Sequence, residues 1–387
     1  MARWIGLWLA CFGGASALGC AGEELSRPNL VLISVDTLAA DQLACFGGPG
    51  DSGQSVCRLA EQGTLFAWTM TPGRGIASSA ASVLTGLTEA GHGVDDTGLS
   101  FLRDARETLA ERLARVGYAT AAFVASPRLN RTRRLDQGFD HYDDRFASNL
   151  DLPTRVQKWI ARSSTAYFVW IHLRGEAGLS DIDRLVARLD GVLQDDARQA
   201  GVLFAALRGT DPSQTGIGLS SHRVPMIWRA PATFRSGAPS QVSLALASLL
   251  DITPTLTASA GIPGPESGDR PALGHPLDRA LGSVEDRFLL LRDSARNGEV
   301  GLASGPYLYV RKRSALDTTG RPVPSSALTA QAPRFLTLVS GGAATAGSAG
   351  LAHMPWRKDV LSTDSPVPRL EFHLARRLRE EAESALE

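Results

Sequence analysis

The feature that most constrains the fold is a repeated alternation of short apolar runs with segments of helical spacing. Continuous apolar runs occupy residues 30–35, 120–125, 167–173, 202–206 and 226–228, and helical spacing occurs at 107–116 and 182–193. Apolar runs of this length are typical of strands buried on both faces, and strands that alternate with helices usually pair in parallel. We therefore predict an α/β fold, in which a mainly parallel sheet carries helices on both faces.

The composition allows such a core and excludes one class of partner. The chain has 387 residues, of which 43% are hydrophobic, and can bury one large α/β domain or two smaller ones. Its formal net charge is +0, and it has no charged tail. This charge pattern gives no indication of binding to nucleic acid.

The first twenty residues predict export. Arg3 precedes the apolar run 4–10, and small residues then lead to Cys20. These are the parts of a secretory signal, and the apolar run is too short to span a membrane. A Cys after a small residue resembles a bacterial lipobox, so we expect residues 1–20 to be a signal peptide of lipoprotein type, with Cys20 as the lipidation site. An ordinary secretory signal is the alternative.

Either signal places the protein in the bacterial cell envelope, on the periplasmic or outer-membrane face, and lipidation would hold it at the membrane through Cys20. Two cysteines, Cys45 and Cys57, remain in the body of the chain. They can pair with each other or stay buried and inert, and the sequence leaves both possibilities open.

The segment 71–94 has the form of a catalytic segment without its catalyst. Small residues from Ala77 to Ser82 open an apolar helix that Gly86 ends, and the free N–H groups at its start could hold an anion. Ile76 stands directly before these small residues and has no nucleophilic atom. In a parallel sheet ligands sit beyond the carboxyl ends of the strands, where we expect Asp36, the Ile76 turn, His172 and Leu207 to converge.

The same segment resembles the C-x-P-S-R-A-S-L-L-T-G motif of type I sulfatases, in the alkaline phosphatase-like superfamily. The match lies at Ser79, Ala81, Ser82 and the closing Leu84-Thr85-Gly86. Further blocks follow in the family's order, and together they cover roughly residues 28 to 315: they lie at 28–47, 108–140, 223–231 and 250–263. In the family the first residue of the motif becomes the formylglycine nucleophile, and here that position holds Ile76.

The resemblance also implies a domain organisation. We expect a sulfatase-like α/β domain over residues 27–281 and a reduced C-terminal subdomain over 282–387, because family members end in a small antiparallel sheet with a packed helix. Beyond residue 282 the pattern predicts strands, a loop rich in Gly, Ala and Ser, and an amphipathic helix, at 288–291, 307–310, 340–350 and 370–386.

Sulfatases hold a divalent cation, usually calcium, with carboxylates. Asp36 resembles the first of two adjacent Asp ligands, but Thr37 stands at the second. Leu207 and Arg208 replace the carboxylate and its neighbour at another ligand block. The resemblance therefore implies that Asp36 is a vestigial ligand, that calcium binds weakly or not at all, and that Arg208 could form a salt bridge with Asp36.

The family's other catalytic groups are also missing. The stretch 124–127 lacks the expected Lys and His, and the block at 171–177 keeps His172 but has Ala177 at its second His. Ser78 or Ser79 with a nearby His172 or His222 could form a rebuilt nucleophilic site, to which Glu176 could contribute. The structural interpretation is that both serines cap the helix, that His172 belongs to its strand end, and that His222 is a solvated loop residue.

Three functions follow from these residues. The first is a degenerate sulfatase, used as a binding or scaffolding module with an envelope partner or a sulfated or phosphorylated ligand, and with no cofactor. The second is a diverged hydrolase of sulfate or phosphate esters that would use calcium. The third is binding of sulfated polysaccharides through Arg74, Arg174 and Arg208.

Overall fold

The structure is a computed structural model. It describes residues 27–145, 151–175, 178–196, 200–210, 216–231, 241–263, 274–277, 287–293, 298–304, 307–312, 334–338, 356–357, 373 and 376. The predicted signal peptide with Cys20, the pair Glu176 and Ala177, and the loop 340–350 lie outside the described residues.

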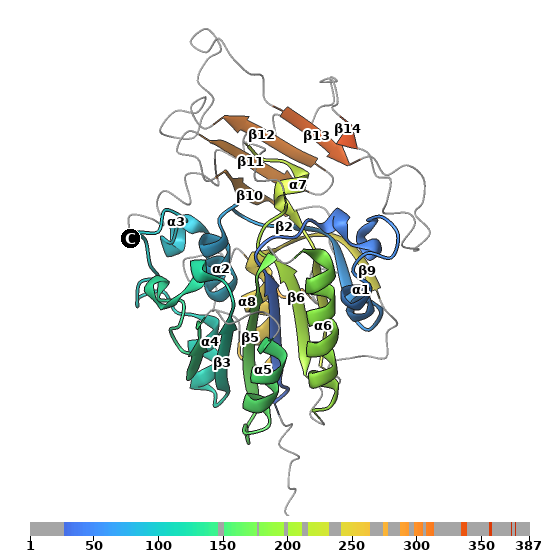
Figure 1. Ribbon diagram of the computed structural model, residues 1–387. Helices are drawn as coiled ribbons and strands as arrows, with labels where there is room; N and C mark the ends of the chain where they lie inside the picture. Colours follow the sequence, from blue (N-terminus) through green and yellow to red (C-terminus); the bar gives the residue numbers. More distant parts are fainter. Residues whose placement is uncertain are drawn as a thin grey trace, which may run out of the picture.

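A nine-stranded sheet forms the centre of the molecule, in the order β4-β3-β5-β1-β6-β8-β2-β7 with β9 paired to β2 (Figure 1). Neighbouring strands from β4 to β6 pair in parallel, as do β2 and β9, whereas β8 and β7 are antiparallel to their neighbours. The mainly parallel sheet is thereby confirmed. Its strands are β1 Leu30–Val35, β2 Thr64–Met70, β3 Ala119–Val124, β4 His141–Asp143, β5 Tyr167–Leu173, β6 Gly201–Ala206, β7 Arg223–Val224, β8 Met226–Arg229 and β9 Gln241–Ser248.

Helices cover both faces of this sheet. In Figure 1, α5 and α6 lie in front of it and α8 lies behind it. Contacts between helices form two groups: α6 contacts α1 and α5, and α2, α4 and α8 contact one another. The described helices are α1 Gln54–Glu61, α2 Ile76–Thr85, α3 Glu89–His92, α4 Leu109–Arg115, α5 Leu152–Ile160, α6 Leu179–Gln194, α7 Leu219–His222 and α8 Ile252–Ser259.

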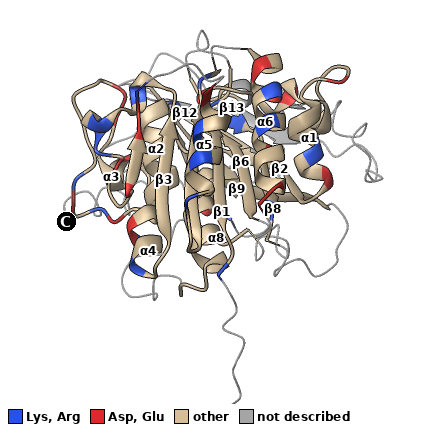
Figure 2. Cartoon of the chain, turned by 60° about the horizontal axis from the view of Figure 1, so that its bottom comes forward, with Lys and Arg blue, Asp and Glu red and all other residues tan. Residues whose placement is uncertain are grey.

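The apolar runs of the sequence become the core. Every residue of β1, β5 and β6 is buried, and the charged residues lie mainly on the helices and loops around them (Figure 2). Burying one large aliphatic side chain contributes about 1.5–3 kcal/mol, so the continuous runs drive the assembly of the sheet. The sequence pattern did not predict β2 or β9, which form the far edge of the sheet.

Local capping sets the start of α4. The helix predicted at 107–116 begins at Leu109, because Thr108 is its N-cap and forms a capping box with Glu111. Glu111 N–H donates to Thr108 Oγ1 at 3.1 Å, and Thr108 N–H donates to Glu111 Oε2 at 2.8 Å. The sequence period thus located the helix, and a polar pair fixed its first residue.

A second, antiparallel sheet follows, in the order β10-β11-β12-β13-β14. It confirms the predicted strands at 288–291 and 307–310. Only residues 373 and 376 of the predicted C-terminal helix are described, and both are helical. The domain boundary at residue 282 stays a prediction. The strands are β10 Leu289–Arg292, β11 Glu299–Ser304, β12 Tyr307–Lys312, β13 Arg334–Leu338 and β14 Trp356–Arg357.

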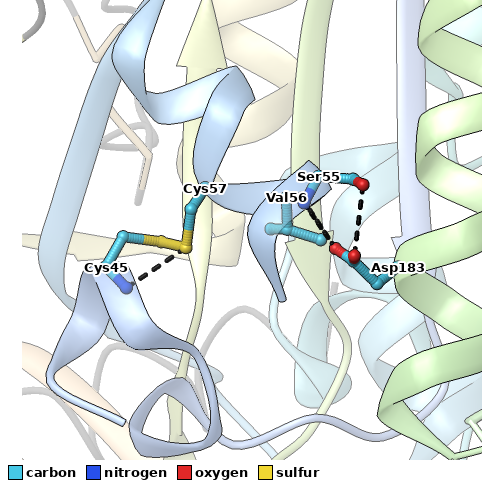
Figure 3. Close-up of a disulfide and its surroundings, with 5 residues drawn as sticks. All are labelled: Cys45, Ser55, Val56, Cys57 and Asp183. Carbon is cyan, nitrogen blue, oxygen red and sulfur yellow. Dashed lines mark hydrogen bonds between the residues drawn. A yellow bond between two sulfur atoms is a disulfide. The ribbon is translucent and has the colours of Figure 1, made fainter. Parts of the chain in front are cut away.

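Cys45 and Cys57 form a disulfide with 5.5 Å between their Cα atoms, so the two cysteines that the sequence left open are paired (Figure 3). Beside it, the Asp183 carboxylate of α6 accepts hydrogen bonds from the first turn of α1. The disulfide links the loop after β1 to α1, and the hydrogen bonds of Asp183 link α1 to α6. In the part of the chain that the structure describes, no helix is long and apolar enough to cross a membrane.

Candidate functional site

The carboxyl ends of four parallel strands meet at one edge of the main sheet. Asp36 N–H donates to Leu173 O at 3.1 Å, Leu207 N–H to Val35 O at 2.8 Å, and Ala125 N–H to His172 O at 3.1 Å. The start of α2 reaches this edge, because α2 packs against the 3-10 turn Pro127–Leu129 that follows β3. Asp36, His172 and Leu207 are therefore brought together as the parallel topology predicted.

His172 lies at the centre of a buried hydrogen-bond chain across β1 and β5. Trp170 Nε1–H donates to Ser34 Oγ at 2.8 Å, Ser34 Oγ lies 2.7 Å from His172 Nδ1, and His172 Nε2 lies 2.8 Å from Asp36 Oδ1. A carboxylate only accepts, so Nε2 carries the proton and Ser34 donates to Nδ1. His172 is fully buried and uses both ring nitrogens within the strands, which fits the structural interpretation.

Asp36 is ionised in this setting. Burial raises its pKa, but the electrostatic interaction and the hydrogen bond with His172, a hydrogen bond from Ser126 and the charge of Arg208 together bring the pKa below its ordinary value. The carboxylate is buried, with 6% of the residue exposed. Its negative charge is thus stabilised by the chain's own groups and not left free for a ligand.

The residues around Asp36 do not fit a calcium ion. Leu207 is fully buried and offers no oxygen, and the Thr37 hydroxyl accepts a hydrogen bond from Arg208 Nε at 2.9 Å. Calcium takes six to eight oxygen ligands, and a guanidinium in that shell repels it. Among the described residues, no group of three or more His, Cys, Asp or Glu side chains could hold a metal.

Arg208 binds a different partner from the one predicted. Its guanidinium donates to Thr37, and Asp36 pairs with His172, so the structure does not contain the expected Arg208–Asp36 salt bridge. Burial and the charges of Arg128 and Arg74 lower the pKa of Arg208, while Asp36 and Asp96 raise it. Asp36 therefore affects the pKa of Arg208 through its charge, without a direct salt bridge.

The start of α2 confirms the helix predicted in segment 71–94. It runs from Ile76 to Thr85, and Gly86 ends it in the left-handed conformation with φ of 73°. Ile76, where the sulfatase motif has its nucleophile, is 3% exposed and packs in the core. Gly75 is the N-cap and offers no side chain, and the Ala77 N–H donates to Asp96 Oδ1 at 3.1 Å.

Ser78 and Ser79 do not cap α2, so that interpretation was wrong. They are the third and fourth residues of the helix and are buried. Ser78 Oγ–H donates to Glu89 Oε2 at 2.7 Å. Ser79 Oγ lies 3.1 Å from Thr71 Oγ1, and because Thr71 donates to Gly73 O, Ser79 is the donor between them. None of the described hydrogen bonds joins the hydroxyl of either serine to a histidine.

Glu89, the partner of Ser78, could not be identified from the sequence pattern. Burial raises its pKa most, a hydrogen bond from Ser78 and the charge of Arg292 lower it, and the charges of Asp96 and Asp95 raise it; the net pKa is above the ordinary value. Ser78, Glu89 and Arg292 line a small cavity of about 10 Å³, with room for roughly one water molecule.

A second residue that sequence reasoning missed is His92. Its Nδ1 accepts the Val94 N–H at 3.0 Å, so Nε2 carries the proton and donates to Ser82 Oγ at 3.1 Å. Burial lowers the His92 pKa to about 3. A His ten residues after a helical Ser was the available signal, but sequence distance did not show that the α2–α3 turn brings them together.

His222 is buried, so its interpretation as a solvated loop residue was wrong. Its Nδ1 lies 2.8 Å from Ser221 Oγ, and Nε2 lies 3.3 Å from Arg292 O of the second sheet. Burial lowers its pKa to about 4. The ring thus joins the two sheets, and the described contacts do not connect it with Ser78 or Ser79.

The arginines predicted to bind sulfate are only partly available. Arg74 forms a salt bridge with Asp293 of the second sheet at 3.4 Å, and Arg208 uses Nε on Thr37. Arg174 is half-buried directly after β5. Glu176, the acidic candidate in the same stretch, lies outside the described residues.

Comparisons with known proteins point to one family. The family model described as Sulfatase matches residues 28–215. An N-acetylglucosamine-6-O-sulfatase from Bacteroides thetaiotaomicron is 28% identical over 139 residues, which are 35% of this chain. The matched segment spans only 23% of the length of that relative.

Solved structures share the fold at low identity. A protein in complex with its substrate D-glucosamine-2-N,6-O-disulfate has a TM-score of 0.67 and 12% identity, covering 93% of this chain and 98% of that chain. A protein of the alkaline phosphatase superfamily from Vibrio parahaemolyticus has a TM-score of 0.67 and 13% identity, covering 93% and 88%. The phosphonate monoester hydrolase of Agrobacterium radiobacter has a TM-score of 0.65 and 14% identity, covering 93% and 96%.

Proposed function

We propose that this chain, which belongs to the sulfatase family through residues 28–215, is a catalytically degenerate member that keeps the fold as a binding or scaffolding module. One observation carries the proposal: a buried Ile76 side chain stands at the nucleophile position of the helix start. An aliphatic side chain cannot attack sulfur or phosphorus, and nothing can activate it.

The residues at the metal-ligand positions of the family support the same conclusion. Leu207 and Thr37 stand at two ligand positions, and Asp36 is engaged by His172 and Ser126. We propose that calcium is not a resident cofactor, because a single engaged carboxylate beside Arg208 is a poor donor set for a hard cation.

The protein would act in the bacterial cell envelope, anchored to the membrane by a lipid at Cys20. The Cys45–Cys57 disulfide supports export, because disulfides persist in oxidising compartments. Two of the proteins named above, the N-acetylglucosamine-6-O-sulfatase and the protein in complex with D-glucosamine-2-N,6-O-disulfate, have names that refer to sulfated amino sugars. A sulfated or phosphorylated group, or a partner that carries one, is therefore the ligand class we propose.

The test is to measure calcium content and turnover in the same sample. The purified chain is exposed to calcium, analysed for bound metal, and assayed with an aryl sulfate and an aryl phosphate. We expect neither bound calcium nor turnover. The matched control is the double variant Thr37→Asp with Leu207→Asp, which restores two carboxylates and should raise calcium affinity. Stoichiometric calcium together with turnover in the wild type would contradict the proposal.

One contact favours a second candidate, a diverged hydrolase of sulfate or phosphate esters. Ser78 Oγ–H donates to Glu89, whose raised pKa brings it closer to that of a general base. In this alternative Ser78 is the nucleophile and Glu89 takes its proton. The adjoining cavity of about 10 Å³ is too small for an ester, so the second sheet, which contributes Arg292, would have to move.

The two candidates are separated by variants of that pair. If wild-type turnover is found, Ser78→Ala and Glu89→Gln should abolish it, whereas Ser79→Ala, one residue further along α2, should leave it largely intact. Turnover that survives Ser78→Ala would instead indicate a contaminating enzyme or another nucleophile.

A further inference from the structure

Two helices of the main domain begin in the same unusual way. Gly53 is the N-cap of α1 and Gly75 is the N-cap of α2, and neither offers a capping side chain. Each helix start receives a carboxylate from a distant part of the chain instead, Asp183 for α1 and Asp96 for α2. A carboxylate at this position satisfies free N–H groups and the positive end of the helix dipole.

The two carboxylates differ in the number of hydrogen bonds that they accept. Asp183 Oδ1 accepts from Ser55 N–H at 2.7 Å and Val56 N–H at 3.1 Å, and Oδ2 accepts from Ser55 Oγ at 3.1 Å (Figure 3). Among the described residues, Asp96 Oδ1 accepts a hydrogen bond from the Ala77 N–H alone, at 3.1 Å. Asp96 Oδ2 is buried and accepts no hydrogen bond from the part of the chain that the structure describes. A buried, unpaired carboxylate oxygen is costly, so Asp96 is a poor structural cap.

The Asp96 carboxylate lies where an external anion would bind at the start of α2. Its Oδ1 accepts the Ala77 N–H, and a Cβ atom built on Gly75 would lie 1.4 Å from Oδ2, so the carboxylate lies against the backbone of the helix start. Helix starts of this kind bind sulfate, phosphate or carboxylate groups. The charge of Asp96 also acts on the guanidinium of Arg208.

We infer that Asp96 is an internal oxyanion, which occupies the anion position at the start of α2, within electrostatic reach of Arg208, and keeps a sulfate or phosphate group out of that position. The inference deepens the proposed function and rests on it, since it identifies what closes the ligand position of a module without turnover. Wild-type protein then admits an oxyanion only when Asp96 is displaced.

The loop that carries Asp96 is held independently of this contact. Asp95 N–H donates to Ser100 Oγ at 2.7 Å, and Ser100 Oγ–H donates to Asp95 Oδ1 at 2.6 Å. Arg133 Nη1 donates to the carbonyls of Ser100 at 2.9 Å and Asp95 at 3.2 Å. Removing the Asp96 carboxylate therefore leaves the loop in place and opens the anion position.

The experiment titrates the full chain with inorganic sulfate and inorganic phosphate by calorimetry. Asp96→Ala should bind at least one of them about tenfold more tightly than the wild type, because it frees the helix start and removes a repelling charge. Asp96→Asn, which keeps an oxygen for Ala77 N–H but loses the charge, should lie between the two. The double variant Asp96→Ala with Arg208→Ala should bind sulfate and phosphate no more tightly than the wild type.

Two controls exclude simpler explanations. Asp104→Asn makes the same change of net charge at an exposed salt bridge with Arg134 and should leave anion affinity unchanged. Asp183→Ala opens the start of α1, which has no Arg208 beside it, and should also gain nothing. Circular dichroism checks that each variant folds, and the isosteric Asp96→Asn keeps the test valid if Asp96→Ala does not.

Turnover is measured on the same samples, so the two proposals can fail separately. Equal anion affinity in wild type, Asp96→Ala and Asp96→Asn would overturn the role of Asp96 and leave the proposed function standing. Hydrolysis of an aryl sulfate by the wild type would overturn the proposed function. A gain in anion affinity without turnover would support both.

Discussion

Asp36 follows β1 and Glu89 begins α3, and the surroundings of these two carboxylates shift their pKa values in opposite directions. Burial raises both pKa values, but His172, Ser126 and Arg208 lower that of Asp36 below its ordinary value. Glu89 has Ser78 and Arg292 as favourable neighbours and Asp96 and Asp95 as unfavourable ones, and its pKa remains raised. Burial alone therefore does not determine whether a carboxylate charge is stabilised; the neighbouring groups do.

This difference distinguishes two regions of the molecule. In the Asp36 region, at the ends of β1 and β5, hydrogen bonds and charges stabilise the carboxylate, and its charge contributes to stability. The Glu89 region, formed by α2, α3 and the loop with Asp96, holds a charge that burial disfavours and a buried neutral His92.

Acid should destabilise the protein through two buried neutral histidines, His92 in the Glu89 region and His222 beside the second sheet. The pKa of His92 is lowered from 6.5 to about 3 and that of His222 to about 4, so the unfolded chain binds more protons below pH 6.5. Stability from these groups is present above pH 6.5 and is lost as the pH falls toward the folded-state values. Urea denaturation should show a loss of about 3 kcal/mol or more between pH 6.5 and pH 4.5. His92→Gln should reduce that loss. If the free energy of unfolding of this variant depended on pH as steeply as that of the wild type, the loss could not be attributed to His92.

Ile76→Ala should destabilise the protein by about 3 kcal/mol at pH 7, because it leaves a cavity in the core at the start of α2. Chemical denaturation measures the effect. Ile76→Val is the matched control and should cost about 1 kcal/mol. A cost below that of the control would mean that Ile76 is not packed as the structure has it.

Asp36→Ala should cost about 2 kcal/mol at pH 7, since it leaves the buried Nε2–H of His172 without an acceptor. Asp36→Asn should cost less, because its amide oxygen can still accept from His172. The Asp36 charge stabilises the fold above its unfolded pKa and loses that effect as the pH falls through the lower folded value. The difference in free energy of unfolding between wild type and Asp36→Asn should therefore shrink below about pH 4. Equal stability of the two proteins at pH 7 would mean that the Asp36 charge does not stabilise the fold, and Asp36 would then not differ from Glu89 in this respect.

Glu89→Gln should change stability least and in the opposite direction. The raised pKa of Glu89 means that its charge costs free energy at pH 7, and a glutamine oxygen can still accept from Ser78. We expect a gain of up to about 0.5 kcal/mol. The gain should disappear on acidification, when wild-type Glu89 becomes protonated. A clear loss of stability at pH 7 would show that the charge itself is needed.

The family blocks and the apolar runs located most of the fold. The strands at 30–35 and 167–173 have the predicted bounds, and α2 ends at Gly86 as expected. β2 and β9 were missed, because their mixed apolar and hydroxyl residues show a strand only once they pair with each other at the sheet edge. The helix motif was found from small residues, but the N-cap is Gly75, one position before the residue the motif aligns with the nucleophile.

The amino-acid sequence establishes which chemical groups are present: Ile76 at the nucleophile position, Leu207 and Thr37 at ligand positions, and one remaining Asp36. Folding cannot supply a functional group that the chain lacks. How the remaining polar groups are used depends on the tertiary structure. Asp36 pairs with His172, Arg208 with Thr37, Ser78 with Glu89 and Asp96 with the start of α2. These contacts join residues up to 171 positions apart, and no local pattern encodes them, because each depends on which loops the sheet topology brings to the same edge.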